Sequence, residues 1–311
     1  MCNGIKSKKI IKRKRRIKFM EKSKVYFSRE ISSKSLVKLF EKVGKELKGN
    51  IAIKVHSGED GNQNYLRPAF LEEIVNHLKG TIVECNTAYP GMRDTTEKHK
   101  VLLEKHGWSK YFKVDILDAK DDLVLNIPNG KIISKNYVGK NIENYDSMLV
   151  LSHFKGHPMG GYGGALKQLS IGLSSSKGKR YIHCAGKDNG TYEEMFDTNQ
   201  LSFLEAMADA ASSVINYFEN NIVYLNVMCN MSVDCDCCAN AQDPCMKDIG
   251  ILASTDPVAI DKACIDLVFS SNDPGKDALI KRIEDRKGTH VIDAAYKLGI
   301  GNVEYELVDV D

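Results

Sequence analysis

Long apolar runs are missing from this sequence of 311 residues, which has no stretch of about 18 consecutive apolar residues that could span a membrane. Its N-terminal part also lacks the apolar segment of a secretory signal, so we expect a cytoplasmic protein with no membrane partner. Aromatic residues are few, with a single Trp, and there is no repeat, coiled-coil heptad or low-complexity linker. An apolar content of 42% is nevertheless sufficient for a buried core, which predicts a folded globular chain.

Basic residues are concentrated at the N-terminus. Residues 1–24 contain eleven Lys and Arg against one acidic residue, whereas the rest of the chain has 33 basic and 40 acidic residues. Runs of like charge are usually solvated tails. We therefore expect residues 1–24 to be a disordered tail or the product of an upstream start codon, and we expect no specific nucleic-acid partner.

From residue 25 onward, strand-like apolar runs alternate with amphipathic segments of helical length. This alternation predicts an α/β fold, with mainly parallel sheets and helices on both faces. We expect residues 25–311 to form one domain that can divide near residues 140–150 into two α/β lobes around a cleft. The expected strands are 51–55, 81–85, 112–116, 123–127, 131–138, 144–151, 222–227, 248–253 and 303–308, and the expected helices are 68–79, 95–106, 200–219, 257–268, 277–286 and 290–298.

The most unusual stretch is residues 153–167, which contain two histidines, two lysines and five glycines. It joins an expected strand to the start of an expected helix. Glycines at such a junction let a ligand approach the backbone, and the first N–H groups of a helix attract anions. Because no Gly-Lys-Ser/Thr closes the segment, it is not a P-loop. We expect it to bind an anionic group, with Lys167 on the first helical turn.

Three basic residues in this segment alternate, namely His153, Lys155 and His157. If the strand continues through them, their side chains share one face at its carboxyl end, where ligands of open α/β sheets bind. Two imidazoles and an ammonium can bind a metal, act as acid and base, or hold an anion. We expect these three residues to be catalytic. The alternative is that one or both histidines cap backbone groups in a tight loop.

Four of the nine cysteines fall within eleven residues, at Cys235, Cys237, Cys238 and Cys245. A partly buried thiolate needs a cation, so this cluster predicts a metal site. Its spacing matches neither a standard ferredoxin nor a zinc ribbon. An iron–sulfur cluster is the first interpretation, zinc is the second, and a redox-sensitive loop that binds nothing is the third.

Six motifs stand out along the chain, at residues 54–59, 89–99, 152–157, 160–167, 234–237 and 248–261. Together they resemble the domain of unknown function 362 family, whose members are often described as iron–sulfur centre proteins. The resemblance covers nearly everything after residue 24. It implies an iron–sulfur cluster, of the [4Fe–4S] type, at the four cysteines, and an electron-transfer partner. Many members carry a ferredoxin-like cysteine module before the long helix, whereas residues 184–199 contain one cysteine here.

A more distant likeness is to the lactate racemase family, which uses a nickel-pincer nucleotide. That family has a His, a glycine turn, a Lys bonded to the cofactor and a nickel-ligand His, and His157, residues 161–164, Lys167 and His183 occur in the same order. Its Gly-x-His-Arg motif is represented only by Gly-Met-Arg at residues 91–93, so a catalytic base is missing. The likeness implies a cofactor site made by Gly161, Gly163, Gly164, Lys167 and His183, to which we add Arg93.

The sequence thus predicts a metal- or iron–sulfur-dependent enzyme that performs redox or acid/base chemistry on a small-molecule substrate. We expect the loops after strands 51–55 and 81–85 to bring His56, Glu59 and Arg93 across a cleft from the glycine-rich segment. Two alternatives stay open. One is a non-catalytic protein that binds zinc or an anion such as a nucleotide, and the other is a lactate-racemase-like enzyme with a metal-pincer cofactor.

Overall fold

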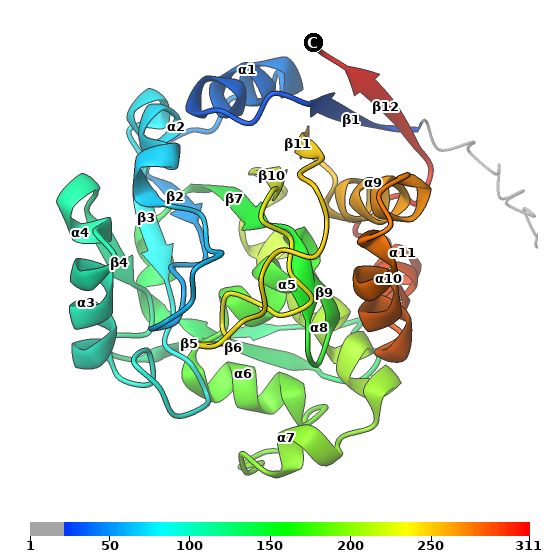
Figure 1. The fold of residues 1–311 in the computed structure, drawn as a ribbon. Coiled ribbons are helices and arrows are strands. Elements are labelled where there is room, and N and C mark those ends of the chain that lie inside the picture. The colour runs from blue at the N-terminus through cyan, green and yellow to red at the C-terminus, as the bar shows by residue number, and fades with distance from the viewer. Residues whose placement is uncertain (1–21) are drawn as a thin grey trace, which may run out of the picture.

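The computed structural model describes residues 22–311, so the expected basic tail lies almost entirely outside the described residues (Figure 1). A mixed sheet of eight strands forms the centre. Five of its seven strand pairs are parallel, and the two pairs made by β11 are antiparallel, which confirms the prediction of an α/β fold with a mainly parallel sheet. Across the sheet the order is β12 (Tyr305–Asp309), β1 (Ser23–Ser28), β11 (Gly250–Ser254), β10 (Ile222–Met228), β7 (Ser147–His153), β2 (Ile51–Lys54), β3 (Thr81–Glu84) and β4 (Val114–Ile116).

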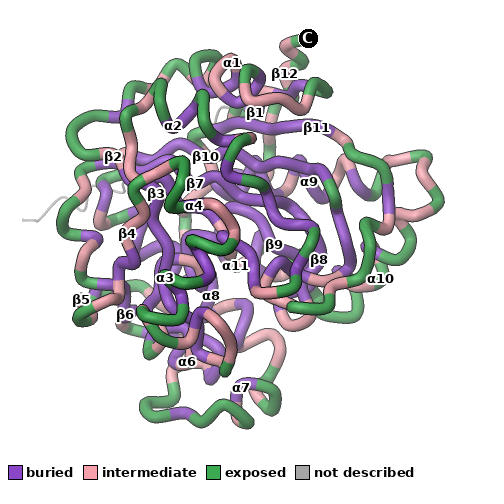
Figure 2. The backbone as a smooth tube through the Cα atoms, turned by 60° about the vertical axis from the view of Figure 1, so that its left-hand side comes forward, coloured by how far each residue is buried: buried purple, intermediate pink, exposed green. Residues whose placement is uncertain are grey.

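Helices cover both faces of this sheet. In β7, Met148 and Val150 join the core on one face and Leu149 and Leu151 join the core on the other, as expected for a strand covered on both sides. The strand is buried along its whole length (Figure 2). The first face is packed by α5 (Ala165–Lys167), α6 (Ser176–His183), α8 (Gln200–Tyr217), α9 (Pro257–Ser270), α10 (Lys276–Asp285) and α11 (His290–Leu298). The second is packed by α1 (Ser33–Val43), α2 (Glu72–Leu78), α3 (Thr96–Lys105) and α4 (Trp108–Tyr111).

Two small antiparallel sheets flank the central one. The first pairs β5 (Asp122–Asn126) with β6 (Lys135–Gly139), and the second pairs β8 (Lys155–His157) with β9 (Gly161–Gly163). Neither the second hairpin nor helix α1 was predicted from the sequence. The remaining helical segments are α7 (Glu194–Asp197) and the short turns η1 (Pro68–Leu71), η2 (Lys140–Asn144) and η3 (Gln168–Gly172).

One continuous sheet joins the two halves of the described chain. β7, which begins within the suggested division at residues 140–150, pairs with β2 on one side and with β10 on the other, both parallel. Because parallel strands end at the same edge, the loops after β2, β3, β7 and β10 meet there. Among the described residues, no helix combines the length and the hydropathy needed to cross a membrane.

Candidate functional site

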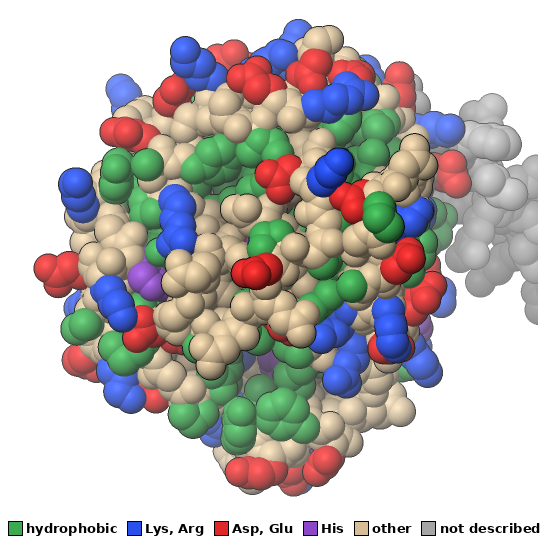
Figure 3. All heavy atoms as spheres, viewed as in Figure 1, with side chains coloured by type: hydrophobic (Ala, Val, Ile, Leu, Met, Phe, Trp, Pro, Cys, Tyr) green, Lys and Arg blue, Asp and Glu red, His purple; other side chains and the backbone are tan. Residues whose placement is uncertain are grey.

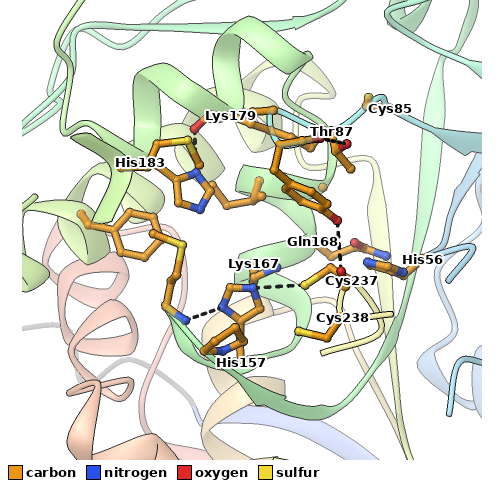
Figure 4. Close-up of a pocket in the computed structure, with 18 of the residues that line it drawn as sticks. His56, Cys85, Thr87, His157, Lys167, Gln168, Lys179, His183, Cys237 and Cys238 are labelled. Carbon is orange, nitrogen blue, oxygen red and sulfur yellow. Dashed lines mark hydrogen bonds between the residues drawn. The ribbon is translucent and has the colours of Figure 1, made fainter. Parts of the chain in front are cut away.

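A cavity of about 320 Å³ lies where these loops meet, at the carboxyl ends of the parallel strands (Figure 4). The space-filling view shows a hollow with a histidine at its base and hydrophobic side chains along its lower rim (Figure 3). Each loop supplies polar side chains to the cavity. They include Lys54 and His56 from β2 and its loop, Glu84 and Arg93 from β3 and its loop, His157 and Lys167 after β7, His183 from α6, and Cys237 and Cys238 after β10.

Three candidate metal ligands meet beside this cavity. The ligand atoms of His157, Cys235 and Cys237 all lie within 4.8 Å of one another, and Cys237 Sγ is 3.8 Å from His157 Nε2. Within residues 22–311 this is the one group of three or more such atoms. Sulfur and imidazole nitrogen suit zinc, iron or nickel, so a metal ion can bind here.

The other two predicted ligands are placed differently. Cys238 N donates to Cys235 O at 2.9 Å, which closes a turn at residues 235–238, here called the cysteine turn. The thiol of Cys238 interacts with that of Cys237. Cys245 lies outside the turn, and its thiol donates to Met231 O at 3.2 Å. Three of the four thiols therefore share one turn, and the four-cysteine site stays a prediction.

A distant loop holds the cysteine turn in place. Asn62 Nδ2 donates to Cys238 O at 2.9 Å and to Cys235 O at 3.4 Å, and Glu59 N donates to Asp236 O at 2.8 Å. These bonds form because the loops after β2 and β10 leave the sheet at the same edge. Sequence reasoning did not find Asn62, since an Asn in a polar loop is usually only a turn residue.

The environment of Cys235 and Cys237 favours the protonated form of their thiols in the absence of a cation, whereas the hydrogen bond with Cys237 lowers the pKa of Cys238. Burial raises the pKa of Cys235 well above its ordinary value. The Cys235 thiol lowers the pKa of Cys237, but the Cys238 thiol and burial raise it, to about 11. A metal ion that binds to these sulfurs replaces their protons, so binding would release protons and weaken at low pH.

His153 and Lys155, two of the three predicted catalytic residues, belong to a buried charge cluster and do not line the cavity. Asp236 lies 3.0 Å from His153 Nδ1 and 2.7 Å from Lys155 Nζ. His153 Nε2 also donates to Cys229 O at 2.6 Å. Burial raises the pKa of Asp236, but His153 and Lys155 more than offset this and hold it below its ordinary value. Because Asp236 lies between two cysteines of the turn, the cluster fixes the turn's position.

At the glycine-rich junction, the carboxylate of Asp261 binds where an anionic ligand was expected. Asp261 accepts hydrogen bonds from Ala165 N at 2.7 Å and Leu166 N at 3.0 Å, the free N–H groups at the start of α5. A Cβ on residue 164 would lie 2.5 Å from Asp261 Oδ1, so only Gly164 admits this carboxylate. Burial raises the pKa of Asp261 to about 6, although the hydrogen bonds it accepts oppose the shift.

The other two predicted cofactor-binding glycines also pack against protein. Gly161 has φ +83°, and a Cβ there would lie 2.7 Å from Gly288 Cα. A Cβ on Gly163 would lie 3.5 Å from Lys155 Cε. Neither these two glycines nor Gly164 lines the cavity. Their proposed contact with a cofactor stays a prediction. The observed packing explains the small size of Gly161, whereas a Cβ at position 163 would make only an ordinary van der Waals contact.

Lys167 and His183, by contrast, both face the cavity (Figure 4). The Lys167 ammonium has neither an acidic partner nor a hydrogen-bond acceptor in the described part of the chain. His183 Nδ1 donates to Lys179 O at 2.7 Å, and its ring stacks on Phe203. Burial lowers the pKa of His183 to about 4, so at neutral pH the ring is neutral and Nε2 carries a lone pair.

Arg93 also lines the cavity, as predicted from its loop, but two carboxylates already engage it. Its Nε donates to Glu59 Oε2 at 3.2 Å, and its Nη1 lies 3.6 Å from Glu84 Oε1. Glu84 also accepts from Lys54 Nζ at 2.7 Å. Burial raises the pKa of Glu84, but Lys54 and Arg93 outweigh it and lower the value to about 2.

Sequence reasoning missed Lys54 and Glu84. Each is the last residue of an otherwise largely apolar parallel strand, which is the signal that could have found them. It also missed Lys179, a buried residue of α6.

The cavity has a positive excess and an apolar wall. Five basic residues line it, against one acidic residue, Glu84. The basic residues are Lys54, Arg93, Lys167, Lys179 and Arg286. Opposite them, Tyr192 and Phe196 are 39% and 58% exposed, beside the buried Met195. Such a cavity suits a small organic anion.

The fold and site define an α/β protein with a group of Cys and His side chains that could hold a metal ion beside a cavity rich in Lys and Arg. The chain belongs to the family described as "Domain of unknown function (DUF362)", whose model matches residues 51–266. This range includes the cysteine turn, Lys167 and His183.

No curated protein matches the chain. Among solved structures, it is similar to the lactate racemase apoprotein from Thermoanaerobacterium thermosaccharolyticum, with a TM-score of 0.48, 16% identity, and coverage of 80% of this chain and 58% of that chain. It is also similar to a protein from Thermotoga maritima, with a TM-score of 0.41, 10% identity, and coverage of 85% and 58%. The chain thus spans less than two thirds of either protein.

Proposed function

We propose that this protein is a metal-dependent enzyme that binds a small anionic substrate beside a metal ion held at the cysteine turn. One observation carries the proposal. The ligand group of His157, Cys235 and Cys237 lies beside a cavity into which Lys167 directs an ammonium without any partner in residues 22–311. Lys167 is half-buried, and a partly desolvated cation that the protein leaves unpaired is costly, a cost that an anionic ligand offsets.

The donor set fits a single zinc or iron ion better than a four-iron cluster. A [4Fe–4S] cluster takes four ligands, commonly thiolates, whereas Cys245 is directed away from the turn to Met231 O. Two or three thiols beside imidazoles are typical of a mononuclear site with an open position. Bound there, the metal would supply Lewis acidity or, as iron, electron transfer.

The chain's own residues would bind the substrate and move its protons. Lys167 binds and orients the anionic group. His183 Nε2 is an acceptor, because Nδ1 donates to Lys179 O. His56 has the opposite arrangement. Its Nδ1 accepts from Gly58 N at 3.1 Å, so the neutral ring carries its proton on Nε2. The cavity thus holds one neutral imidazole that can accept a proton and one that can donate a hydrogen bond to the substrate.

Metal and sulfide analysis of anaerobically purified protein tests this proposal. We expect about one zinc or iron ion per chain without stoichiometric sulfide. The C237S variant should lose the metal, and the matched control C245S should retain it. A wild-type chain that stays metal-free after incubation with Zn²⁺ or Fe²⁺ would refute the proposal. Stoichiometric sulfide would instead favour an iron–sulfur cluster.

A second candidate is an enzyme with a cofactor bonded to Lys167. The observation that favours it is the position of Lys167 and His183 on the same cavity, as a metal-pincer cofactor would require. Intact-mass spectrometry distinguishes the two candidates. A Lys167-linked cofactor adds mass to the wild-type chain and none to K167M, whereas the first candidate leaves both chains at their sequence masses.

A further inference from the structure

The hydrogen bonds of His157 determine which of its ring nitrogens carries a proton. Its Nδ1 accepts from Met159 N at 3.1 Å and from Gly160 N at 2.9 Å. A nitrogen that accepts two N–H bonds cannot itself be protonated, so the neutral ring carries its proton on Nε2. That is the nitrogen that points at Cys237 Sγ, 3.8 Å away (Figure 4).

A protonated Nε2 cannot act as a metal ligand, because its lone pair belongs to the ring. For Nε2 to ligate, the proton would have to move to Nδ1, where two backbone N–H groups already point. Histidines that ligate metals usually have the opposite arrangement, with the other nitrogen donating to a carbonyl or a carboxylate. His183 has that arrangement and His157 does not.

We infer that His157 stays outside the metal's ligand set and donates an Nε2–H···Sγ hydrogen bond to the Cys237 thiolate, while sulfurs of the cysteine turn hold the metal. The inference rests on the proposed function, since it requires a metal at the turn. Hydrogen bonds to ligating sulfur tune the electronic properties of the metal. His157 is therefore a positioning and tuning residue for the metal site.

The local structure holds the ring in this orientation. His157 is 5% exposed and ends β8, and residues 158–160 turn so that both N–H groups converge on Nδ1. The ring cannot turn over without leaving these two donors unpaired, and for the buried Gly160 N–H that costs about 1–3 kcal/mol. The tautomer is thus set by the backbone before any metal binds.

NMR of the histidine side-chain nitrogens tests the tautomer directly. We expect His157, assigned by comparison with H157Q, to be protonated on Nε2 in the metal-free protein and in the zinc-loaded protein alike. A zinc-loaded protein in which His157 is protonated on Nδ1, with Nε2 bound to zinc, would overturn the inference.

Zinc affinity, measured by competition with a chelator, provides a second readout. Loss of a supporting hydrogen bond typically costs 10- to 100-fold in affinity, so H157A should bind zinc about 10- to 100-fold more weakly. H157Q keeps an N–H donor and should recover to within about tenfold of wild type. C237S should lose binding altogether, and C245S should match wild type. If H157Q binds as poorly as C237S, His157 is a ligand.

The two proposals fail in different ways. A wild-type protein that binds no zinc or iron refutes the proposed function. A protein that binds metal through His157 refutes only the inference about its role. X-ray absorption at the zinc edge separates these cases, because imidazole scattering that disappears in H157Q would identify His157 as a ligand.

Discussion

Lys155 and Lys167 lie in the same glycine-rich segment, yet their surroundings differ. Lys155 Nζ is 2.7 Å from Asp236, and both residues are buried. Lys167 faces the cavity and has no partner in residues 22–311. Loss of one partner of a buried ion pair leaves the other charge uncompensated and destabilises the structure, whereas a charge that the protein leaves unneutralised is available to a ligand. The comparison separates residues that hold the fold from residues that form the site.

The largest expected effect is the loss of Asp236. In D236N, Lys155 and His153 lose their shared carboxylate, so the free energy of unfolding should fall by about 3–5 kcal/mol. Urea denaturation measures this change. The control is D234N, which removes a more exposed partner of Arg282 and should cost less than about 1 kcal/mol. Equal effects in the two variants would show that the cluster around Asp236 is not structurally important.

Replacing Lys155 or Lys167 by Met tests the comparison itself. K155M leaves Asp236 with one basic partner and should cost about 3 kcal/mol or more. K167M removes an unpaired ammonium and so should leave the free energy of unfolding unchanged or raise it by up to about 0.5 kcal/mol. Urea denaturation of both variants measures these changes in the free energy of unfolding. If K167M were as destabilising as K155M, Lys167 would be part of the scaffold.

Lowering the pH should reveal how much Glu84 contributes to the free energy of unfolding. Its folded pKa, about 2, lies below the ordinary value of 4.5, so its stabilisation is present above about pH 4.5 and is lost as the pH falls toward 2. The difference corresponds to about 3 kcal/mol. E84Q should therefore be less stable than wild type at pH 7, and the gap should close near pH 2. Urea titrations at both pH values measure it, and a gap independent of pH would contradict the assignment.

A smaller loss of stability than in D236N, K155M or E84Q is expected at the carboxylate that caps α5. D261N should lower the free energy of unfolding by about 1–3 kcal/mol, because N–H groups of Ala165 and Leu166 lose a charged acceptor. G164A should disturb the same contact, since its Cβ would press on Asp261. The double variant should therefore cost less than the sum of the two, as measured by thermal or urea unfolding. Strict additivity would show that the two residues act independently.

Local sequence patterns predicted the strands and helices of the central layers well. The apolar runs at 51–55, 81–85 and 222–227 became β2, β3 and β10, and the parallel edge brought the predicted residues Arg93, Lys167 and His183 to one cavity. The hairpin of β8 and β9 was missed because Gly-rich segments have no periodic apolar pattern. The expected convergence of His153, Lys155 and His157 depended on one continuous strand, and β7 ends at His153.

The sequence by itself determined the α/β class and the segments that carry chemistry, because apolar periodicity and clusters of His, Lys, Gly and Cys are local properties. Only the tertiary structure decided which of those residues are neutralised and which face the cavity. His153 meets Asp236 across 83 residues of chain, and Ala165 meets Asp261 across 96. Charge compensation depends on such distant partners, so an isolated motif cannot show whether its cations hold the fold or bind a ligand.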